Sequence, residues 1–356
     1  MKLLHSADWH LDAPMLGKTP EQTAYLRQEL LKIPETIMGL CREQGCDVLL
    51  LSGDLFDGAY TKESYLAVYR ALEAVKIPVF ITPGNHDYYC PSSVYMAENW
   101  PENVHIFTRS SMESVSLPEL DCTIYGAGYE SMDCPALLKD FHASEDSRLH
   151  IGILHGDPTQ ANSPYCPISS RQLKESGLQY LALGHIHKDG QIIAGDTLCA
   201  WPGCPMGKDF GETGTKGVLL VTLEDTAQAQ LIPLDTPRFF DEKVDVGESA
   251  AEAVASILPA AQTQNFYRIT LTGYSPKLNT EEIAAHFPHI PNLELRDQTL
   301  PEVDLWECAG DDTLEGMFFR ILRDGMETDS QALQSKLKLA ARISRQILDG
   351  QEVVLP

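Results

Sequence analysis

The sequence is short of basic residues. Its 356 residues include 27 lysines and arginines against 51 aspartates and glutamates, so the formal net charge at pH 7 is −24. The excess runs along the whole chain, because residues 1–236 carry 31 acidic and 16 basic side chains and residues 237–356 carry 20 and 11. This excludes an extended basic surface, which is the usual electrostatic footprint of a nucleic-acid binder. Binding of a polyanion would therefore need a local patch, bound cations or a partner.

Long apolar runs and paired cysteine motifs are also missing. No apolar stretch approaches the ~18–20 residues that cross a bilayer, and the N-terminus becomes polar too early for a signal peptide. We therefore expect a cytoplasmic protein that makes no membrane contact. The nine cysteines are odd in number and none of them forms a CxxC motif, which argues against a zinc knuckle or a redox pair. Free, buried thiols in a reducing compartment are the expected state.

Short β-rich runs alternate with helical patterns over residues 1–225. Runs rich in Val, Ile, Leu and Tyr predict strands at residues 2–7, 47–52, 78–82, 122–126, 150–154, 180–183, 197–201 and 217–223. Helical patterns at residues 21–44 and 62–75 lie where crossovers between parallel strands are expected. Pro34 is predicted to kink or split the first of them.

A domain boundary is predicted near residues 234–238, between Pro233 and Pro237. We assign residues 1–236 to the main domain, 237–325 to a small α+β domain and 326–356 to a C-terminal helical segment. The small domain is expected to hold helices at 249–258 and 280–286 and strands at 266–272 and 293–296. The last helix is predicted at 329–348, with Asp329 or Ser330 as its N-cap.

Five polar motifs stand where predicted strands end. They are Asp8-Trp9-His10, Gly53-Asp54-Leu55-Phe56-Asp57, Gly84-Asn85-His86-Asp87, His155-Gly156 and Gly184-His185-Ile186-His187. Since the carboxyl ends of neighbouring strands share one edge of a sheet, these side chains should converge. Carboxylate, imidazole and amide ligands without thiolate suit Mn²⁺, Fe²⁺ or Zn²⁺ rather than a structural zinc site.

Each motif alone is compatible with an ordinary turn, but the ordered set predicts a centre for two metal ions. A single carboxylate, Asp54, can bridge two cations about 3.5–4 Å apart, and such a pair binds a phosphate and lowers the pKa of a water molecule. The histidines outside the motifs are expected to be structural or surface groups. His5 and His150 lie in predicted strands, where we expect them to pack in the core.

The motifs resemble those of the calcineurin-like metallophosphoesterase superfamily. The run from His5 to Leu11 and the run 53–57 are more narrowly similar to SbcD-type DNA repair nucleases, YhaO-like proteins among them. Asp57 is followed by Gly58-Ala59-Tyr60, without the arginine that protein phosphatases of this superfamily carry there. The resemblance covers residues 1–210. It implies a two-sheet αββα sandwich followed by a small α+β capping domain that helps to hold DNA.

The resemblance also implies a role for every matching side chain. Two divalent ions, with Mn²⁺ preferred and Fe²⁺ or Zn²⁺ as alternatives, would share one bridging ligand, Asp54. The first ion would take Asp8, His10 and His187, and the second would take Asn85, His155 and His185. His86 would stabilise the transition state or protonate the leaving oxygen, a role that suits imidazole. Asp57 and Asp87 would orient a histidine or a loop.

The function predicted from this resemblance is a metal-dependent DNA exonuclease or endonuclease that acts in DNA repair. A small-molecule phosphodiesterase or phosphatase is one alternative, which the acidic composition favours. The other is a nuclease-like subunit that has little activity without an SbcC-type ABC ATPase with a coiled coil. Nucleases of this family work as homodimers and bind that ATPase through helices after the cap. The helix at 329–348 is a candidate for this contact, although amphipathic terminal helices commonly pack on their own domain.

Overall fold

The chain forms two compact units, Met1–Phe240 and Asp241–Pro356. The structure, a computed structural model, describes residues 1–146, 148–301, 304–327, 330–350 and 352–353. The boundary between the units follows residue 240, and the sequence analysis places it after residue 236. Within the described residues, no helix has the length and apolar character needed to span a membrane.

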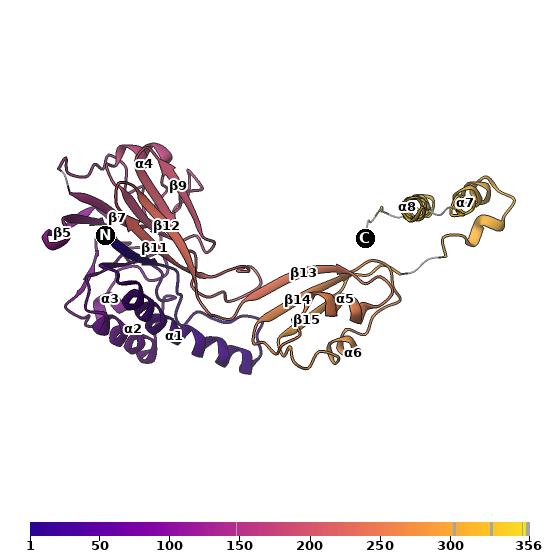
Figure 1. The fold of residues 1–356 in the computed structure, drawn as a ribbon, viewed down its shortest axis with the longest axis horizontal. Helices are drawn as coiled ribbons and strands as arrows, with labels where there is room; N and C mark the ends of the chain where they lie inside the picture. The colour runs from indigo at the N-terminus through magenta and orange to yellow at the C-terminus, as the bar shows by residue number, and fades with distance from the viewer. Residues whose placement is uncertain (147, 302–303, 328–329, 351, 354–356) are drawn as a thin grey trace. The chain divides into compact units, whose positions relative to one another are not determined.

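Two six-stranded sheets form the body of the first unit (Figure 1). The first has the order β12-β11-β1-β2-β3-β4, from β1 (Lys2–Ser6), β2 (Val48–Leu51), β3 (Val79–Ile81), β4 (Val104–Ile106), β11 (Gly217–Leu223) and β12 (Ala227–Pro233). The second has the order β5-β6-β7-β8-β10-β9, from β5 (Glu113–Leu117), β6 (Cys122–Gly126), β7 (Leu149–His155), β8 (Tyr180–Gly184), β9 (Gly190–Ala194) and β10 (Thr197–Trp201). In the first sheet β1 to β4 are parallel, and in the second β6, β7, β8 and β10 are parallel.

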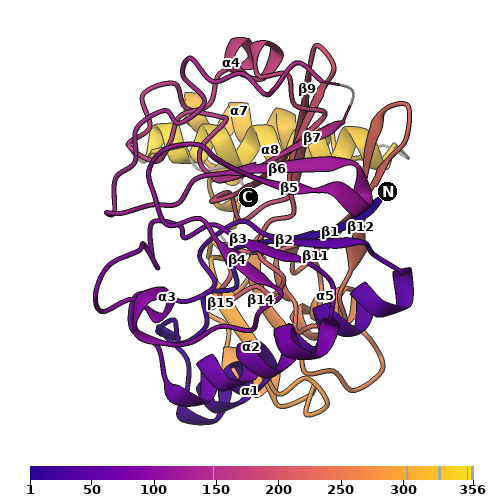
Figure 2. The ribbon, with the colours of Figure 1, turned by 90° about the vertical axis from the view of Figure 1, so that its left-hand side faces the viewer.

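The central strands are buried on both faces, which explains their nearly continuous apolar sequences. Leu50 of β2 and Ile151 and Ile153 of β7 belong to one core cluster between the sheets. Helices α1 (Pro20–Gln44) and α2 (Lys62–Val75) lie over the outer face of the first sheet, and α4 (Ser170–Glu175) lies over the second (Figure 2). The predicted two-sheet sandwich with flanking helices is confirmed.

Helix α1 begins and ends as its sequence dictates. Thr19 and Gln22 form a capping box at its N-terminus, and Gly45 closes it in the left-handed region with φ of 63°. Pro34 lies inside one continuous helix, so the expected split is wrong. The proline is buried, as are Ile33 and Ile37, and burial of this apolar face offsets the missing hydrogen bond.

The second unit contains a three-stranded sheet and several helices. The sheet has the order β13-β14-β15, from β13 (Phe239–Asp245), β14 (Phe266–Thr272) and β15 (Leu293–Asp297). The helices are α5 (Ala250–Ile257), α6 (Thr280–Ala284), α7 (Leu314–Asp324) and α8 (Gln331–Leu348). Ser330 caps α8 through the Leu333 amide, while the alternative cap Asp329 lies outside the described residues. Strand β13 and helix α7 are elements that the sequence analysis did not predict.

Candidate metal centre

Each of the five motifs follows, or ends, a parallel strand of the first unit. Asp8, Asp54 and Asn85 follow β1, β2 and β3 of the first sheet, while His155 ends β7 and His185 follows β8 of the second. The carboxyl ends of both sheets therefore meet at one edge of the sandwich. Several of these residues have left-handed backbone: φ is 54° at Asp8, 51° at Asp54 and 97° at His185. Such conformations are uncommon outside glycine and concentrate at functional sites.

One group of ligand atoms gathers around His10 and His187. Their Nε2 atoms lie 3.0 Å apart, and the Nε2 of His10 is 3.7 Å from Asp54 Oδ2. The Asp8 carboxylate belongs to the same group, since ligand atoms of Asp8, His10 and His187 lie within 4.8 Å of one another. Asp8 also accepts the backbone N–H of His185 at 2.9 Å, which ties the first motif to the last.

A second group gathers around Asn85. Its Oδ1 atom is 2.9 Å from Nε2 of His155 and 3.1 Å from Nδ1 of His185. The His155 Nε2 atom is also 3.4 Å from Asp54 Oδ2. Asp54 therefore contacts both groups through one carboxylate oxygen, as a bridging ligand would. All seven residues predicted as metal ligands are thus brought together in one place.

The donor set fits cations. The Nδ1 atoms of His10 and His187 face carboxylate oxygens of Asp57 at 3.0 Å and Glu212 at 2.5 Å. Carboxylates only accept hydrogen bonds, so both Nδ1 atoms carry the proton, and in the neutral rings two Nε2 lone pairs face each other across 3.0 Å. Two lone pairs this close need a positive charge between them, which a divalent cation supplies.

The second group favours positive charge for the same reason. His155 Nδ1 donates to the Ser52 carbonyl at 2.9 Å, which aims Nε2 at the oxygens of Asn85 and Asp54. Burial opposes protonation of His155, but the Asp54 charge and hydrogen bond outweigh it and raise its pKa to about 9, so a proton here carries the positive charge that a bound cation would supply in its place. For His185, burial and the neighbouring His155 lower the pKa to about 4, which keeps its ring neutral as a ligand must be.

His86 lies at the rim of the centre, and its side chain is 44% exposed. Its Nδ1 donates to Asp57 Oδ1 at 2.7 Å, and the same oxygen accepts from His10 at 3.0 Å. Asp57 therefore orients two imidazoles at once. The hydrogen bond to Asp57 raises the pKa of His86 against the effect of burial, which favours the protonated ring. The hydrogen bonds from His10 and His86 hold the pKa of Asp57 well below its usual range.

Asp87 is buried beneath the centre, and its hydrogen bonds connect the loop after β2 to the loop after β3. Its carboxylate accepts backbone N–H groups of Gly84 at 2.8 Å and Leu55 at 2.8 Å, and the Tyr95 hydroxyl at 2.6 Å. Leu55 follows the bridging Asp54, and Gly84 precedes Asn85. The carboxylate thus fixes the spacing between two ligands without contacting a metal position itself.

Glu212 is the residue of this site that sequence reasoning missed. It lies in the loop between β10 and β11, where nothing in the local sequence marks it as a partner of His187. Burial favours its neutral form, but the hydrogen bond from His187 and the charge of Lys208 outweigh this and lower its pKa to about 2. Oε2 of the same carboxylate accepts the Lys208 backbone N–H at 2.7 Å.

Comparison with known proteins agrees with this centre. Residues 1–189 match the model of the family described as calcineurin-like phosphoesterase. A curated relative, the uncharacterized metallophosphoesterase YhaO of Bacillus subtilis strain 168, is 32% identical over 237 residues. The match covers 62% of this chain and 57% of that protein, so the chain spans little more than half of its relative.

Two solved structures resemble part of this chain. TT1561 of Thermus thermophilus is 16% identical with a TM-score of 0.42, and the match covers 65% of this chain and 98% of that one. A dimetal phosphatase from Danio rerio is 12% identical with a TM-score of 0.42, over 65% of this chain and 96% of that one. Because the family model spans more than half of the sequence and every predicted metal ligand lies in one cluster, the chain belongs to the calcineurin-like phosphoesterases, a family of metal-dependent phosphoester hydrolases.

Proposed function

We propose that this protein is a phosphodiesterase of the SbcD type that hydrolyses DNA with two divalent cations, Mn²⁺ being the preferred metal. The observation that carries the proposal is the convergence of six ligand side chains around the bridging Asp54, with His86 anchored beside them. The choice of DNA follows from the likeness of the first two motifs to SbcD-type nucleases. Action in DNA repair would follow from the same likeness.

In this proposal, seven side chains bind the metal ions and His86 acts on the reacting phosphate. Asp8, His10 and His187 would hold one ion, Asn85, His155 and His185 the other, and Asp54 both. Bound there, the two ions supply charge for the phosphoryl oxygens and lower the pKa of a water molecule. His86, whose pKa is raised by its hydrogen bond to Asp57, would stabilise the transition state or give a proton to the leaving oxygen.

Replacing His86 tests this assignment most directly. We expect His86→Ala to lower hydrolysis of linear DNA by about 10²–10⁴-fold, the usual contribution of a positioned acid or base. Metal content, measured by elemental analysis, should stay at two ions per chain because His86 is not in the proposed ligand set. Retained activity would remove the role assigned to His86, and lost metal would place it among the ligands.

The substrate is tested by comparing linear double-stranded DNA, single-stranded DNA and bis-p-nitrophenyl phosphate with Mn²⁺, Fe²⁺ and Zn²⁺ in turn. The proposal expects DNA to be degraded, fastest with Mn²⁺. The net charge of −24 favours a second candidate, a phosphodiesterase or phosphatase for small molecules, because a small substrate needs no basic track. Inert DNA beside rapid turnover of the small diester would select that candidate.

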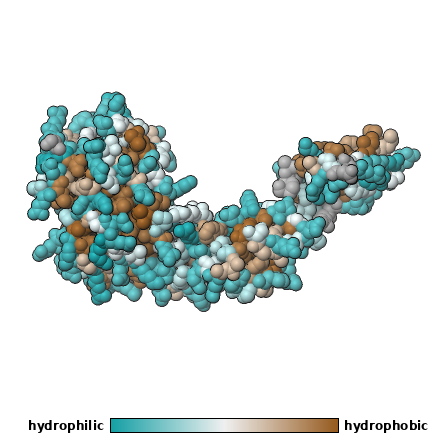
Figure 3. All heavy atoms as spheres, in the orientation of Figure 1, coloured by the Kyte–Doolittle hydropathy of each residue, from teal (hydrophilic) through white to brown (hydrophobic). Residues whose placement is uncertain are grey.

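Apolar side chains exposed on the C-terminal helices support a partner. Leu314, Met317 and Ile321 lie on one face of α7 and are 86%, 52% and 69% exposed. The brown atoms over α7 in Figure 3 show this face. We propose it as the contact for an SbcC-type ABC ATPase or for a second copy of the chain. Activity that rises several-fold when the ATPase is added would support a subunit role, and activity unchanged by any addition would oppose it.

A further inference from the structure

A cavity beside His86 lies outside the ligand cluster. Its volume is about 410 Å³, which is within the size range of small-ligand sites. One wall is the loop 58–60, which directly follows Asp57, and the other is the segment 86–93, which directly follows Asn85. Both walls thus continue from motifs of the metal centre, and the cavity adjoins the place where His86 meets a reacting group.

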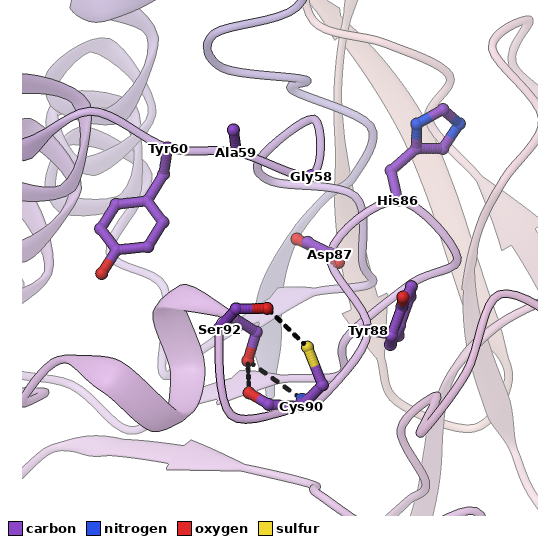
Figure 4. Close-up of a pocket in the computed structure, with 9 residues that line it drawn as sticks. Gly58, Ala59, Tyr60, His86, Asp87, Tyr88, Cys90 and Ser92 are labelled. Carbon is purple, nitrogen blue, oxygen red and sulfur yellow. Dashed lines mark hydrogen bonds between the residues drawn. The ribbon is translucent and has the colours of Figure 1, made fainter.

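Two tyrosines, Tyr60 and Tyr88, make part of the cavity lining aromatic. Figure 4 shows Tyr60 and Tyr88 on opposite sides of the opening, with Cys90 and Ser92 below. Tyr60 is held by a hydrogen bond from its hydroxyl to Glu98 at 3.2 Å and by an edge contact with Phe56. Tyr88 packs against the buried cluster on the outer side of the second sheet. The two aromatic groups are therefore held in position before any ligand arrives.

The lining is poor in charge. It contains no lysine or arginine, and its carboxylate, Asp87, is only 3% exposed and already accepts hydrogen bonds from Gly84, Leu55 and Tyr95. A second phosphate would find no lysine or arginine here to offset its charge, and the imidazole in the lining, His86, already pairs with Asp57. Aromatic faces with nearby hydroxyls suit an uncharged planar ring, because every nucleobase can stack on an aromatic side chain.

We propose that this cavity binds the nucleobase of the leaving nucleoside and so makes the enzyme select nucleoside esters over simple alkyl esters. The proposal rests on the proposed function, in which His86 acts at the leaving oxygen. The group that departs with that oxygen lies on the His86 side of the phosphate, and His86 is one of the residues that line the cavity. Tyr60 and Tyr88 would hold its base, and the exposed Ser92 hydroxyl would contact its polar edge.

Binding of adenosine to metal-free protein tests the site without catalysis. We expect saturable binding by calorimetry, weakened about tenfold or more in Tyr88→Ala and retained in Tyr88→Phe, which keeps the ring. Tyr89→Ala is the matched control, because that neighbouring side chain does not line the cavity. Ala59→Trp fills the exposed rim without removing a contact and should also abolish binding. Failure of the wild-type protein to bind adenosine would overturn the proposal.

Kinetics with the metal-loaded enzyme place the ring on the leaving side. The methyl ester of thymidine 3′-phosphate differs from the dinucleotide thymidylyl-(3′→5′)-thymidine only in the leaving alcohol when the 5′ oxygen departs, and the methyl ester of thymidine 5′-phosphate does so when the 3′ oxygen departs. The products of the dinucleotide show which oxygen departs and therefore which methyl ester is the matched substrate. We expect Tyr88→Ala to lower kcat/KM for the dinucleotide about tenfold and to leave the methyl ester within twofold. An equal fall for both esters, or no change for either, would overturn the leaving-group assignment.

These experiments separate the two proposals. If the wild-type enzyme cleaves both diesters and Tyr88→Ala does not change kcat/KM for either, the proposed hydrolase activity stands and the proposed nucleobase site is wrong. If the wild-type protein cleaves neither diester, the proposed function is wrong. Adenosine binding that is lost in both Tyr88→Ala and Ala59→Trp would still support the nucleobase site.

Discussion

At the metal centre, the tautomer and orientation of three imidazole rings are fixed by the hydrogen-bond partner of each Nδ1 atom. Asp57 accepts a hydrogen bond from Nδ1–H of His10, and Glu212 accepts one from Nδ1–H of His187. The Ser52 carbonyl accepts one from Nδ1–H of His155. Each contact turns the opposite nitrogen toward the metal positions as a lone pair. The residues that fix the tautomers therefore matter nearly as much as the ligands.

Glu212 offers a direct test of this idea. We expect Glu212→Gln to weaken metal binding by about 10–100-fold, because the amide is a poorer acceptor for His187 N–H and no longer fixes the tautomer. Calorimetric titration with Mn²⁺ measures the loss. Glu224→Gln is the matched control, since Glu224 is exposed in the turn between β11 and β12. Equal affinities for both variants would show that Glu212 does not orient His187.

Most of the residues at the centre were predictable from sequence because each lies within a few residues of a strand end. Glu212 was not, since its partner His187 is 25 positions away, with β9 and β10 between them, and the loop that carries Glu212 has no periodic pattern. Only the folded loop brings its carboxylate to the ring. In a glycine-rich loop, the local sequence around a functional glutamate looks the same as that around a glutamate that is merely exposed to solvent.

Among the secondary-structure elements, glycines at strand ends allow the two sheets to meet closely. A Cβ at Gly184 of β8 would collide with the Ser52 carbonyl and lie 2.9 Å from His155 Nδ1. A Cβ at Gly39, inside α1, would meet nothing within 4 Å. The same substitution therefore has opposite consequences in the two elements.

Glycine-to-alanine exchanges measure that difference by urea unfolding. Gly184→Ala should lower the free energy of unfolding by about 1–3 kcal/mol through overpacking and should also weaken metal binding. Gly39→Ala should raise it by about 0.5–1 kcal/mol, because alanine is the better helix former. A neutral Gly184→Ala would mean that the strand ends yield easily and that the close contact is not required.

His5 joins the two sheets through hydrogen bonds within the core. Its Nδ1 lies 2.8 Å from the Tyr180 hydroxyl of β8, and its Nε2 lies 2.6 Å from the Ser52 hydroxyl after β2. Complete burial lowers its pKa from 6.5 to about 3, so the folded protein keeps the ring neutral. The prediction that His5 packs in the core is confirmed, and so is that for His150.

This depressed pKa predicts acid sensitivity. Between pH 6.5 and 3 the unfolded chain binds a proton at His5 that the folded chain does not, so stability falls as the pH drops below 6.5. At pH 5 the loss from this residue is about 2 kcal/mol relative to pH 7 or above. Urea unfolding at pH 7 and pH 5 should show this loss in the wild type and in His286→Gln, an exposed control. His5→Gln, which cannot titrate, should lack it.

The elements that escaped prediction are mostly sheet edges and short segments. β5 and β12 alternate half-buried and exposed residues at the rims of their sheets, and their polar sequences resemble loops. The central strands were found because burial on both faces demands continuous apolar runs. Pairing along an edge is supplied by the neighbouring strand rather than by the edge sequence itself.

For the molecule as a whole, every predicted metal ligand belongs to the first unit, and so do two of its core clusters. The buried clusters around Ile151 and around Leu154 lie entirely within Met1–Phe240. We therefore expect a chain ending at Phe240 to fold, to bind two Mn²⁺ ions like the full chain, and to hydrolyse bis-p-nitrophenyl phosphate within about threefold of its rate. Its metal content and circular dichroism serve as controls. Loss of the metals would show that the second unit stabilises the centre.

The amino-acid order was sufficient to predict the local features: which runs form central strands, where they end, and which polar residues stand at those ends. Burial, strand period and turn chemistry act over a few residues, so they can be read directly. Which supporting groups lie behind those polar residues became known only from the folded chain. Folding placed Glu212 behind His187, shared Asp57 between two imidazoles and opened a cavity between the loops after Asp57 and Asn85. These contacts depend on how loops from separate strands pack together, and no local pattern encodes that packing.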